Sequence, residues 1–414
     1  MRTGFEENEL KKSIKAQLMG AMDFSREVPD EEMFERIDEE VLIATRDKPV
    51  DLSMKKRIRT ELFHAIRKLD VLQELIDDPD ITEIMVNGKD RIFIEKEGRI
   101  HRYAAQFETK ERLEDVIQQM VGACNRVVNE ASPIVDARLM DGSRINIVLP
   151  PVSLDGATVT IRKFPKEAIR MEDLIAFGSL PGYLADYLSV LVKAGYNIFI
   201  AGGTGSGKTT FLNALSDHIP QEERIITIED NAELQIKHIP NLVRLEARNA
   251  NVEGCKEITI RDLIKSSLRM RPDRIVVGEV RGAEAIDMVQ CMNTGHDGSM
   301  STGHSNSAYD MLSRLETMIL MGMELPLAAI RAQIASAIDI VVYLGRLRDR
   351  TRKLLEICEV EKQLTDNGTI RMKTLFAFAE TGEENGRITG EWRREHDLEN
   401  QTKLRASGLT LPAA

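Results

Sequence analysis

The sequence predicts an α/β fold in which a mostly parallel sheet is preceded by a smaller α+β domain and a helical extension. Three observations lead to this prediction. From residue 182 onward, short apolar runs alternate with amphipathic helical segments, as in a parallel sheet covered by helices. Residues 55–165 mix helical spacing with β-rich runs that are split by an Asn87-Gly88 turn signal. Residues 1–54 are helical in pattern and acidic.

The composition is that of a folded, water-soluble protein with more than one domain. Of the 414 residues, 42% are hydrophobic and 30% are charged, and the chain is too long for one ordinary core. The net charge of −11 disfavours non-specific binding to nucleic acid, because that affinity comes from basic groups that neutralise phosphates. Nucleic acid is therefore not an expected partner, although a local basic groove stays open as an alternative.

The cysteines and the start of the chain bear on the cellular compartment. The cysteines lie far apart without a C-x-x-C pair, so we expect reduced thiols rather than a zinc knuckle or a disulfide scaffold; they are Cys124, Cys255, Cys291 and Cys358. The first residues lack the apolar core of a signal peptide, and no stretch reaches the ~18 apolar residues of a membrane span. We therefore expect a cytoplasmic protein with peripheral contact to the inner face of the cell membrane.

The domains are expected in a fixed order along the chain. The acidic extension, 1–54, is expected to be loosely attached, and the α+β domain, 55–165, follows it. A linker at 166–181, which contains "GSLPG", leads into the α/β domain at 182–379. That domain should end in a hairpin around Asn367-Gly368, and the polar residues 380–414 are expected to form a poorly ordered tail.

The strongest chemical signal is "GGTGSGKTT", which satisfies the pattern G-x-x-x-x-G-K-[ST] between an apolar strand and an amphipathic helix. In such a loop, backbone N–H groups cradle phosphate oxygens, Lys208 adds a point charge, and Thr209 offers a magnesium ligand. A merely glycine-rich turn is the alternative, but strand, helix, Lys and Thr are all in register. We therefore expect ATP and Mg²⁺ as ligands. The residues expected to bind the nucleotide are Gly202, Gly203, Thr204, Gly205, Ser206, Gly207, Lys208, Thr209 and Thr210.

Two further apolar strands end in carboxylates. The strand at 275–277 is followed by Gly278 and Glu279, so a glycine stands where an Asp-Glu pair would place the Asp. Another strand ends in Glu229 and Asp230, at the sheet edge where the glycine loop is expected. Such residues are often only loop or cap residues, but the phosphate loop on the same sheet favours a catalytic role for Glu229 and Glu279. Thr209, Glu229 and Asp230 are the candidate metal ligands.

The segment "TGHDGSMSTGHSNSA" places His296 and His304 in a run of small polar residues. A metal site is one interpretation, but no cysteine or third histidine lies close enough in sequence to complete it. A serine nucleophile with histidine as base is a second, and two surface histidines in a polar loop are a third.

Taken together, four segments resemble the conserved boxes of the secretion ATPase superfamily. The segments "GGTGSGKTT", "ITIEDNAEL", "LRMRPDRIVVGEVRG" and "TGHDGSMSTGHSNSA" are similar to its Walker A, Asp, Walker B and His boxes. The upstream "ITEIMVNG", "DARLMDGSRINIVLPP" and "TIRKF" resemble the N-terminal domain of its tight-adherence (Flp) pilus branch. The resemblance runs from about residue 70 to residue 360. The scattered cysteines cannot form the tetracysteine insert of extension-type pilus motors, which favours the tight-adherence or type IV secretion branches.

The resemblance implies roles for residues that the patterns alone leave open. It places His296 and His304 near the γ-phosphate and the subunit interface, as sensors rather than metal ligands, although Gly303 replaces a frequently apolar residue. It also places Arg138, Arg144 and Arg162 at the nucleotide-facing edge of the N-terminal domain; the alternative for each arginine is a solvated surface charge. The methionine-rich segment 311–326 is expected first as helix core and second as a partner surface.

The function that follows from the resemblance is that of a Mg-dependent ATPase with a RecA-like P-loop domain. The resemblance implies a homo-oligomeric ring, usually of six subunits, which moves the N-terminal domain to power pilus assembly or protein secretion through an inner-membrane platform protein. A nucleotide-gated scaffold with little turnover and a DNA-transfer motor of type IV secretion are the alternatives. The water-activating carboxylates Glu229 and Glu279 argue against a pure switch.

Overall fold

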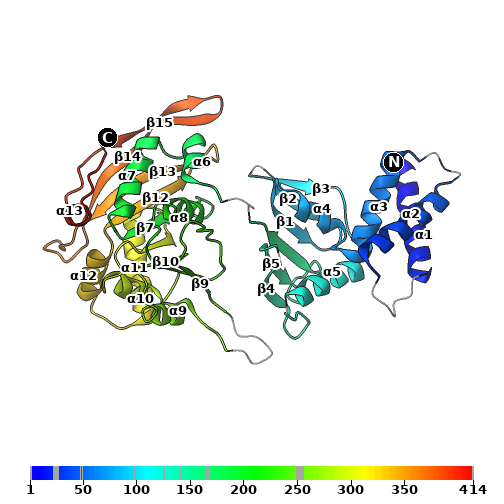
Figure 1. Ribbon diagram of the computed structural model, residues 1–414, viewed down its shortest axis with the longest axis horizontal. Helices are drawn as coiled ribbons and strands as arrows, with labels where there is room; N and C mark the ends of the chain where they lie inside the picture. Colours follow the sequence, from blue (N-terminus) through cyan, green and yellow to red (C-terminus); the bar gives the residue numbers. More distant parts are fainter. Residues whose placement is uncertain are drawn as a thin grey trace. The chain divides into compact units, whose positions relative to one another are not determined.

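The protein forms two compact units, residues 1–165 and 166–414. The computed structural model shown in Figure 1 describes residues 2–21, 28–46, 48, 50–96, 98–124, 126–139, 141–164, 168–248 and 256–412. Cys124, Cys291 and Cys358 are free thiols, and Cys255 lies outside the described residues. Among the described residues, every helix is too short or too polar to cross a lipid bilayer.

The first unit begins with three helices that share an apolar core. They are α1 (Arg2–Ala21), α2 (Asp30–Ala44) and α3 (Leu52–Arg67). Buried Ile14, Met33 and Ile58 come from the three helices in turn. The side chain of Asp51 accepts a hydrogen bond from the Met54 N–H, which satisfies one of the free donors at the start of α3. The helical bundle therefore extends beyond residue 54, the boundary expected from the sequence.

The rest of the first unit is a six-stranded antiparallel sheet with two helices. The strand order is β3-β2-β1-β6-β5-β4, and every neighbouring pair among these strands is antiparallel. The core lies between this sheet and the helices and includes Ile84 and Ile161 from the sheet and Ile117 from α5. The elements are α4 (Val71–Asp77), β1 (Ile81–Asn87), β2 (Ile92–Lys96), β3 (Arg99–Tyr103), α5 (Lys110–Ala123), β4 (Ile134–Arg138), β5 (Arg144–Val148) and β6 (Thr158–Arg162).

The second unit is built on a nine-stranded sheet with the order β15-β14-β13-β12-β7-β11-β10-β8-β9. The strands from β12 to β9 in this order run parallel, whereas β13, β14 and β15 are added antiparallel at one edge. The strands are β7 (Ile198–Gly202), β8 (Ile225–Glu229), β9 (Leu242–Glu246), β10 (Arg274–Val277), β11 (Met300–His304), β12 (Ile340–Arg346), β13 (Arg352–Val360), β14 (Met372–Glu384) and β15 (Arg387–Arg394).

Helices cover both faces of this sheet, as the alternation of apolar runs predicts (Figure 1). In β7, Ile198 and Ile200 pack into one apolar cluster, with α7 and α8, while Phe199 and Ala201 pack into the other, with α9 to α12. The central strand is therefore buried on both faces. The helices are α6 (Met171–Ala176), α7 (Gly182–Lys193), α8 (Lys208–Ser216), α9 (Ile260–Ser267), α10 (Ala285–Met292), α11 (Ala308–Gly322), α12 (Leu327–Ala337) and α13 (Thr402–Ser407).

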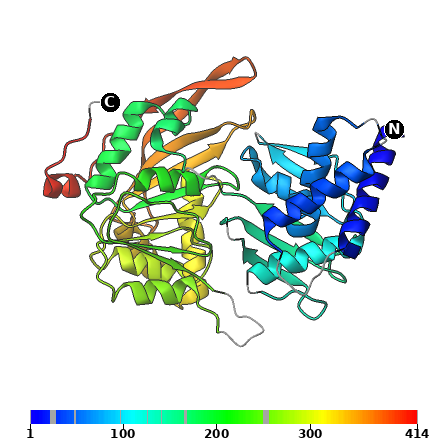
Figure 2. The same cartoon turned by 45° about the vertical axis from the view of Figure 1, so that its right-hand side comes forward.

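The expected hairpin around Asn367-Gly368 is confirmed, since β13 and β14 pair antiparallel on either side of it. The expectation of a poorly ordered tail after residue 380 is wrong for residues 380–412. There β14 continues to Glu384 and pairs with β15, so that the two strands project as a ribbon from the sheet (Figure 2), and α13 follows. The polar composition did not predict an ordered segment, because only a few of its side chains are buried, among them Ile388 and Leu404.

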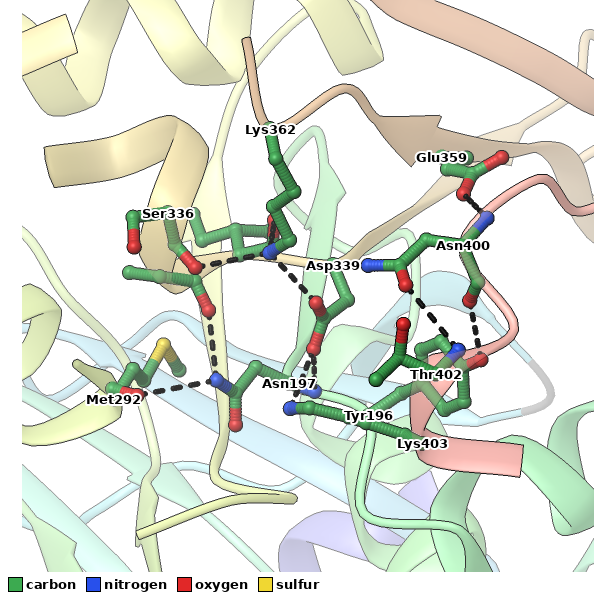
Figure 3. Close-up of polar contacts among 12 residues, drawn as sticks. Tyr196, Asn197, Met292, Ser336, Asp339, Glu359, Lys362, Asn400, Thr402 and Lys403 are labelled. Atoms are coloured by element: carbon green, nitrogen blue, oxygen red, sulfur yellow. Dashed lines mark hydrogen bonds and ion pairs between the residues drawn. The ribbon is translucent and has the colours of Figure 1, made fainter. Parts of the chain in front are cut away.

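The final segment docks on the amino-terminal edge of the central strands through buried polar groups (Figure 3). The backbone N–H groups of Glu399 and Asn400 donate to the buried Glu359 carboxylate at 2.9 and 2.7 Å. The Tyr196 hydroxyl donates to the Asn400 carbonyl at 2.6 Å. Because these are specific contacts to buried groups, the segment is part of the folded unit.

Asp339, which precedes β12, is the most connected charge in this region (Figure 3). Its carboxylate lies 2.7 Å from the ammonium of Lys362 and 2.8 Å from that of Lys403, and it accepts from the Asn197 N–H at 2.8 Å. Only 3% of Asp339 is exposed. Lys403 belongs to α13, so this carboxylate joins the final helix to the central sheet.

Replacing Asp339 with alanine is expected to lower the free energy of unfolding of the second unit by about 3–5 kcal/mol, because two ammonium groups would lose their shared buried partner. Urea unfolding followed by tryptophan fluorescence measures this effect, because the only tryptophan of the chain, Trp392, lies in β15. Asp397→Ala is the matched control, since its carboxylate is 80% exposed and pairs only with a surface arginine. Equal effects of the two substitutions would contradict the assignment of Asp339 as a buried anchor.

Candidate functional site

The glycine-rich loop joins β7 to α8 at the carboxyl edge of the central sheet. Gly205 and Gly207 have φ angles of 73° and 92°, in the left-handed region that favours glycine. A Cβ at Gly202 would lie 2.5 Å from the Leu344 carbonyl oxygen and 2.6 Å from the Ser206 hydroxyl. The loop backbone thus requires glycine at three positions, and it leads directly into the N-terminus of α8, as a phosphate-binding loop does.

Lys208, the first residue of α8, folds back over this loop. Its ammonium donates to the Gly203 carbonyl at 3.0 Å and lies 3.1 Å from Nδ1 of His304. Lys208 is only 7% exposed, and burial lowers its pKa. Because an ammonium can only donate, Nδ1 of His304 is the acceptor and the proton of the neutral ring is on Nε2.

Glu279 follows β10 and lies on the other side of His304. Nε2 of His304 is 2.9 Å from Oε1 of Glu279, while Arg281 donates to Oε2 at 2.6 Å. The structure thus forms a row from Lys208 through His304 to Glu279 at the end of the phosphate loop. Burial and the Lys208 charge lower the pKa of His304, which agrees with a neutral imidazole between an ammonium and a carboxylate.

Arg281 is a site residue that the sequence analysis missed. Besides its bond to Glu279, its guanidinium lies 3.8 Å from the Asp230 carboxylate, so it connects the ends of β10 and β8. In the sequence, the role of Arg281 is indicated by its position in "GEVRG", two residues after Glu279.

Glu229 ends β8 and is 3% exposed. Its Oε1 accepts from the backbone N–H groups of Glu233 and Leu234 at 2.9 and 3.0 Å, whereas its Oε2 has no hydrogen-bond partner among the described residues. Burial raises the pKa of Glu229 to about 7, against the lowering effect of the two backbone bonds. A buried carboxylate oxygen without a protein partner fits a site for a water molecule or for Mg²⁺.

The glycine at position 278 is explained by the same carboxylate. A Cβ at Gly278 would lie 2.9 Å from Cγ of Glu229, so an aspartate in place of Gly278 would collide with the Glu229 side chain. Among the described residues, no cluster of three or more His, Cys, Asp or Glu side chains is arranged to hold a metal ion. Mg²⁺ at nucleotide sites usually takes one or two protein ligands together with phosphates and water, so Thr209, Glu229 and Asp230 remain predicted ligands.

The structure separates the two histidines of the polar run. His304 ends β11 and pairs in register with Gly202, the start of the phosphate loop. His296 lies before β11 at the other edge of the sheet, where its Nδ1 is 3.3 Å from the Cys291 carbonyl oxygen. Within its own chain, His296 therefore lies away from the phosphate loop, and its role near the γ-phosphate and the subunit interface stays a prediction.

Gly303, which replaces a frequently apolar residue, also has a local explanation. A Cβ there would lie 2.9 Å from the Met311 side chain and 3.0 Å from the Phe199 ring. In the methionine-rich segment, Met311 and Met318 are buried as expected for helix core, whereas Met321 and Met323 are exposed. The helix-core interpretation thus holds for Met311 and Met318, and a partner surface stays a prediction for the exposed methionines.

In the first unit, the three expected arginines form a row across neighbouring strands. Arg144 on β5 is directly opposite Arg138 on β4 and Arg162 on β6. Like charges opposite one another destabilise a strand pair, and Glu83 is the residue opposite Arg162 on the next strand. The register thus brings the three predicted phosphate-binding arginines onto neighbouring strands, and their role in binding phosphate stays a prediction.

The turn between β12 and β13 brings another arginine to the phosphate loop. Nε of Arg352 donates to the Gly205 carbonyl at 2.8 Å. Arg352 is not among the residues predicted from the sequence, where its local signal is the density of arginines in "RLRDRTR". Its contact supports the backbone of the loop.

Comparison with known proteins identifies the family. The family described as "Type II/IV secretion system protein" matches residues 66–394, which is most of the chain. The chain belongs to this family. The secretion ATPase superfamily inferred from the four boxes is thereby confirmed.

Relatives and solved structures agree with this family. Type IV secretion system protein VirB11 of Brucella suis is 34% identical over 320 residues, which cover 71% of this chain and 88% of VirB11. "Probable conjugal transfer protein TrbB" of Sinorhizobium fredii is 34% identical over 306 residues, 72% of this chain and 90% of TrbB. The pilus retraction motor PilT with bound ADP has a TM-score of 0.50 at 21% identity and covers 67% of this chain and 77% of that structure. The expected fold class is therefore confirmed: a RecA-like ATPase domain of this secretion family, preceded by an α+β domain and a helical extension.

Proposed function

We propose that this secretion-family protein is a Mg-dependent ATPase that works as a ring-forming motor for pilus assembly or protein secretion. The observation that carries the proposal is the row from Lys208 through His304 to Glu279 at the end of the phosphate loop. A phosphate-binding cation, a hydrogen-bonding imidazole and a carboxylate for water are the groups that hydrolysis of a triphosphate needs. Membership in a secretion ATPase superfamily supports the same activity.

The residues of the chain have distinct tasks in this reaction. The loop N–H groups and Lys208 bind the β- and γ-phosphates, and Glu279 orients the attacking water. Arg281 donates to Oε2 of Glu279, and Nε2 of His304 lies 2.9 Å from Oε1, so both side chains restrict the position of the carboxylate. Each carboxylate oxygen can still accept from water, because it has a second lone pair. Mg²⁺, with Thr209 and either Glu229 or Asp230 as ligands, would supply positive charge that neutralises the phosphates.

The Lys208–His304 contact couples nucleotide binding to Glu279. A triphosphate would draw the ammonium of Lys208 away from Nδ1 of His304, because a phosphate oxygen is a stronger acceptor for a cation than an imidazole nitrogen. The freed imidazole nitrogen could then accept from water while Nε2 still faces Glu279. Loss of the γ-phosphate would return Lys208 to His304. His304 is thus proposed as the sensor of the γ-phosphate.

The arginine row of the first unit is proposed to act on nucleotide held by a neighbouring subunit. Arginines delivered across an interface accelerate related reactions by roughly 10³–10⁵. If Arg144 acts this way, Arg144→Ala and Lys208→Ala are each inactive alone. The Arg144→Ala subunit keeps an intact phosphate loop, and the Lys208→Ala subunit keeps an intact arginine. Mixing the two variants under conditions of subunit exchange is therefore expected to restore part of the phosphate-release activity.

The matched control for this mixture is each inactive variant mixed with itself at the same total concentration. Light scattering or native mass spectrometry shows whether the two variants co-assemble. If folded, co-assembled variants stay inactive at every mixing ratio, the arginines do not act between subunits. The same experiment with Arg162→Ala tests the next position in the row.

The machine that the motor serves is proposed from the relatives. VirB11 is named as a type IV secretion system protein, and the N-terminal boxes resemble the tight-adherence pilus branch, so we propose a pilus or secretion system with a platform protein in the inner membrane. In this proposal the motor works from the cytoplasm at the inner face of that membrane. TrbB, named as a conjugal transfer protein, favours DNA transfer as a second candidate.

Phosphate release with and without single-stranded DNA separates these candidates. The net charge of −11 predicts that DNA leaves the rate unchanged. A salt-sensitive stimulation by DNA would instead support a DNA-transfer motor. Mass photometry of the same sample is expected to show a ring, and a monomer that hydrolyses ATP at the full rate would contradict the ring proposal.

A further inference from the structure

A cavity beside the phosphate loop extends the candidate site to α11. The cavity has a volume of about 510 Å³, which is within the usual range for ligand pockets. Gly203 and Thr204 of the loop line it on one side, and His304 lines it at the end of β11. Arg314 and Thr317 line it from α11. The cavity therefore connects the residues expected around the terminal phosphate to an arginine that no box of the family includes.

The packing of α11 gives Arg314 no structural task. The helix buries Met311, Leu315 and Met318 in the apolar core, while Arg314 is exposed on its other side. Arg314 has no hydrogen bond or ion pair within the part of the chain that the structure describes, although Asp310 lies four residues before it at a spacing that permits a pair. The arginine of neighbouring α12 differs, since Arg331 donates to Glu316 of α11 at 2.9 Å.

The electrostatics at the mouth of this cavity favour an anion. Lys208, Arg281 and Arg314 all act on His304 as nearby positive charges, and Glu279 is the carboxylate that opposes them. Of these groups, His304 and Arg314 line the polar cavity, whose walls also include the hydroxyl-bearing Thr204 and Thr317 and the acidic Asp310. With Asp310 counted, the three cations still exceed the two carboxylates by one positive charge. A bound γ-phosphate would both neutralise this charge and accept hydrogen bonds from these groups.

We infer that Arg314 is a further phosphate ligand of the site, which binds the γ-phosphate of a triphosphate held by the loop of the same chain. This inference rests on the proposed function. A guanidinium offers two parallel donors to a phosphate, which a single ammonium cannot match. Arg314 then distinguishes ATP from ADP, because only the triphosphate places oxygens at the α11 side of the cavity.

Binding of ADP and of a non-hydrolysable ATP analogue to the full chain tests this inference. Arg314→Gln is expected to weaken binding of the analogue by about 10- to 100-fold, the usual value of a charge-assisted contact, while the affinity for ADP stays within about twofold. Arg314→Lys should recover part of the loss. Arg269→Gln is the matched control, because Arg269 is exposed and does not line the cavity.

The outcomes separate this inference from the proposed function. If the unmodified protein binds neither nucleotide, the proposed function fails, and the inference fails with it. If the protein binds and hydrolyses ATP but Arg314→Gln weakens both nucleotides equally or neither, only the inference is overturned. Mixing Arg314→Gln with Lys208→Ala should give no more activity than Arg314→Gln alone, because both residues serve the same site of one chain. Restored activity would show that Arg314 acts in a neighbouring site.

Discussion

Replacing Lys208 with alanine is expected to abolish ATP turnover. Lys208 is the only cation that the phosphate loop itself contributes. Because it is buried, its charge acts on the phosphates with little screening by water, and its loss is not compensated by solvent. Triphosphate affinity should also fall, by roughly 10²-fold or more, since a charge-assisted contact to at least two phosphates is lost. Phosphate release and equilibrium binding of a fluorescent ATP analogue measure the two effects.

The control for this substitution is Lys237→Ala, which removes an exposed lysine of the same unit far along the chain from the loop. Fluorescence of Trp392 shows whether each variant retains the folded second unit, because its indole N–H donates to the Leu354 carbonyl at 2.7 Å. Normal hydrolysis by folded Lys208→Ala protein would contradict the assignment of the nucleotide site.

Replacing Glu279 with glutamine is expected to separate binding from hydrolysis. The amide keeps the size of the side chain and one oxygen, but it removes the negative charge that orients and activates water. ATP should therefore bind with near-normal affinity and persist, while turnover falls by about 10²–10⁴-fold. The loss of charge also removes the ion pair of Glu279 with Arg281 and weakens its contact with the neutral His304.

Glu229→Gln is the matched comparison, because Glu229 is a second carboxylate at this sheet edge and is buried, whereas Glu279 is half-buried. Its Oε1 is already held by two backbone N–H groups, so the structure favours a role in holding water or Mg²⁺ rather than direct activation of the nucleophile. A trapped, unhydrolysed ATP in Glu229→Gln together with an active Glu279→Gln would show that the two roles are reversed.

Residues that belong to one local motif could be predicted from the sequence. The loop from Gly202 to Thr210 depends on glycine positions and on the flanking strand and helix, all of which are contiguous. Glu229 and Glu279 could also be placed, because Glu229 ends one apolar strand, Glu279 closely follows another, and the carboxyl ends of parallel strands share one edge. The row Arg138–Arg144–Arg162 followed from resemblance, and the register of three strands explains why they lie together.

Residues brought together only by the crossing of distant elements could not be predicted. Arg352 contacts the loop from the start of β13, and Arg314 lines the neighbouring cavity from α11; neither position follows from a local pattern. The distance of His296 from the phosphate loop of its own chain does not follow from the sequence, because the polar run hides where the strand begins. Since β11 is five residues long and ends at His304, a residue eight positions earlier lies beyond the other end of the strand.

Sustained phosphate release by the unmodified full chain tests the central claim most directly. With Mg-ATP in excess, the row of Lys208, His304 and Glu279 predicts many phosphates released per chain, at a rate that EDTA and Lys208→Ala both abolish. A nucleotide-gated scaffold would instead bind ATP and release no more than one phosphate per chain, however long the reaction runs. That result would contradict the motor and leave this site as a switch.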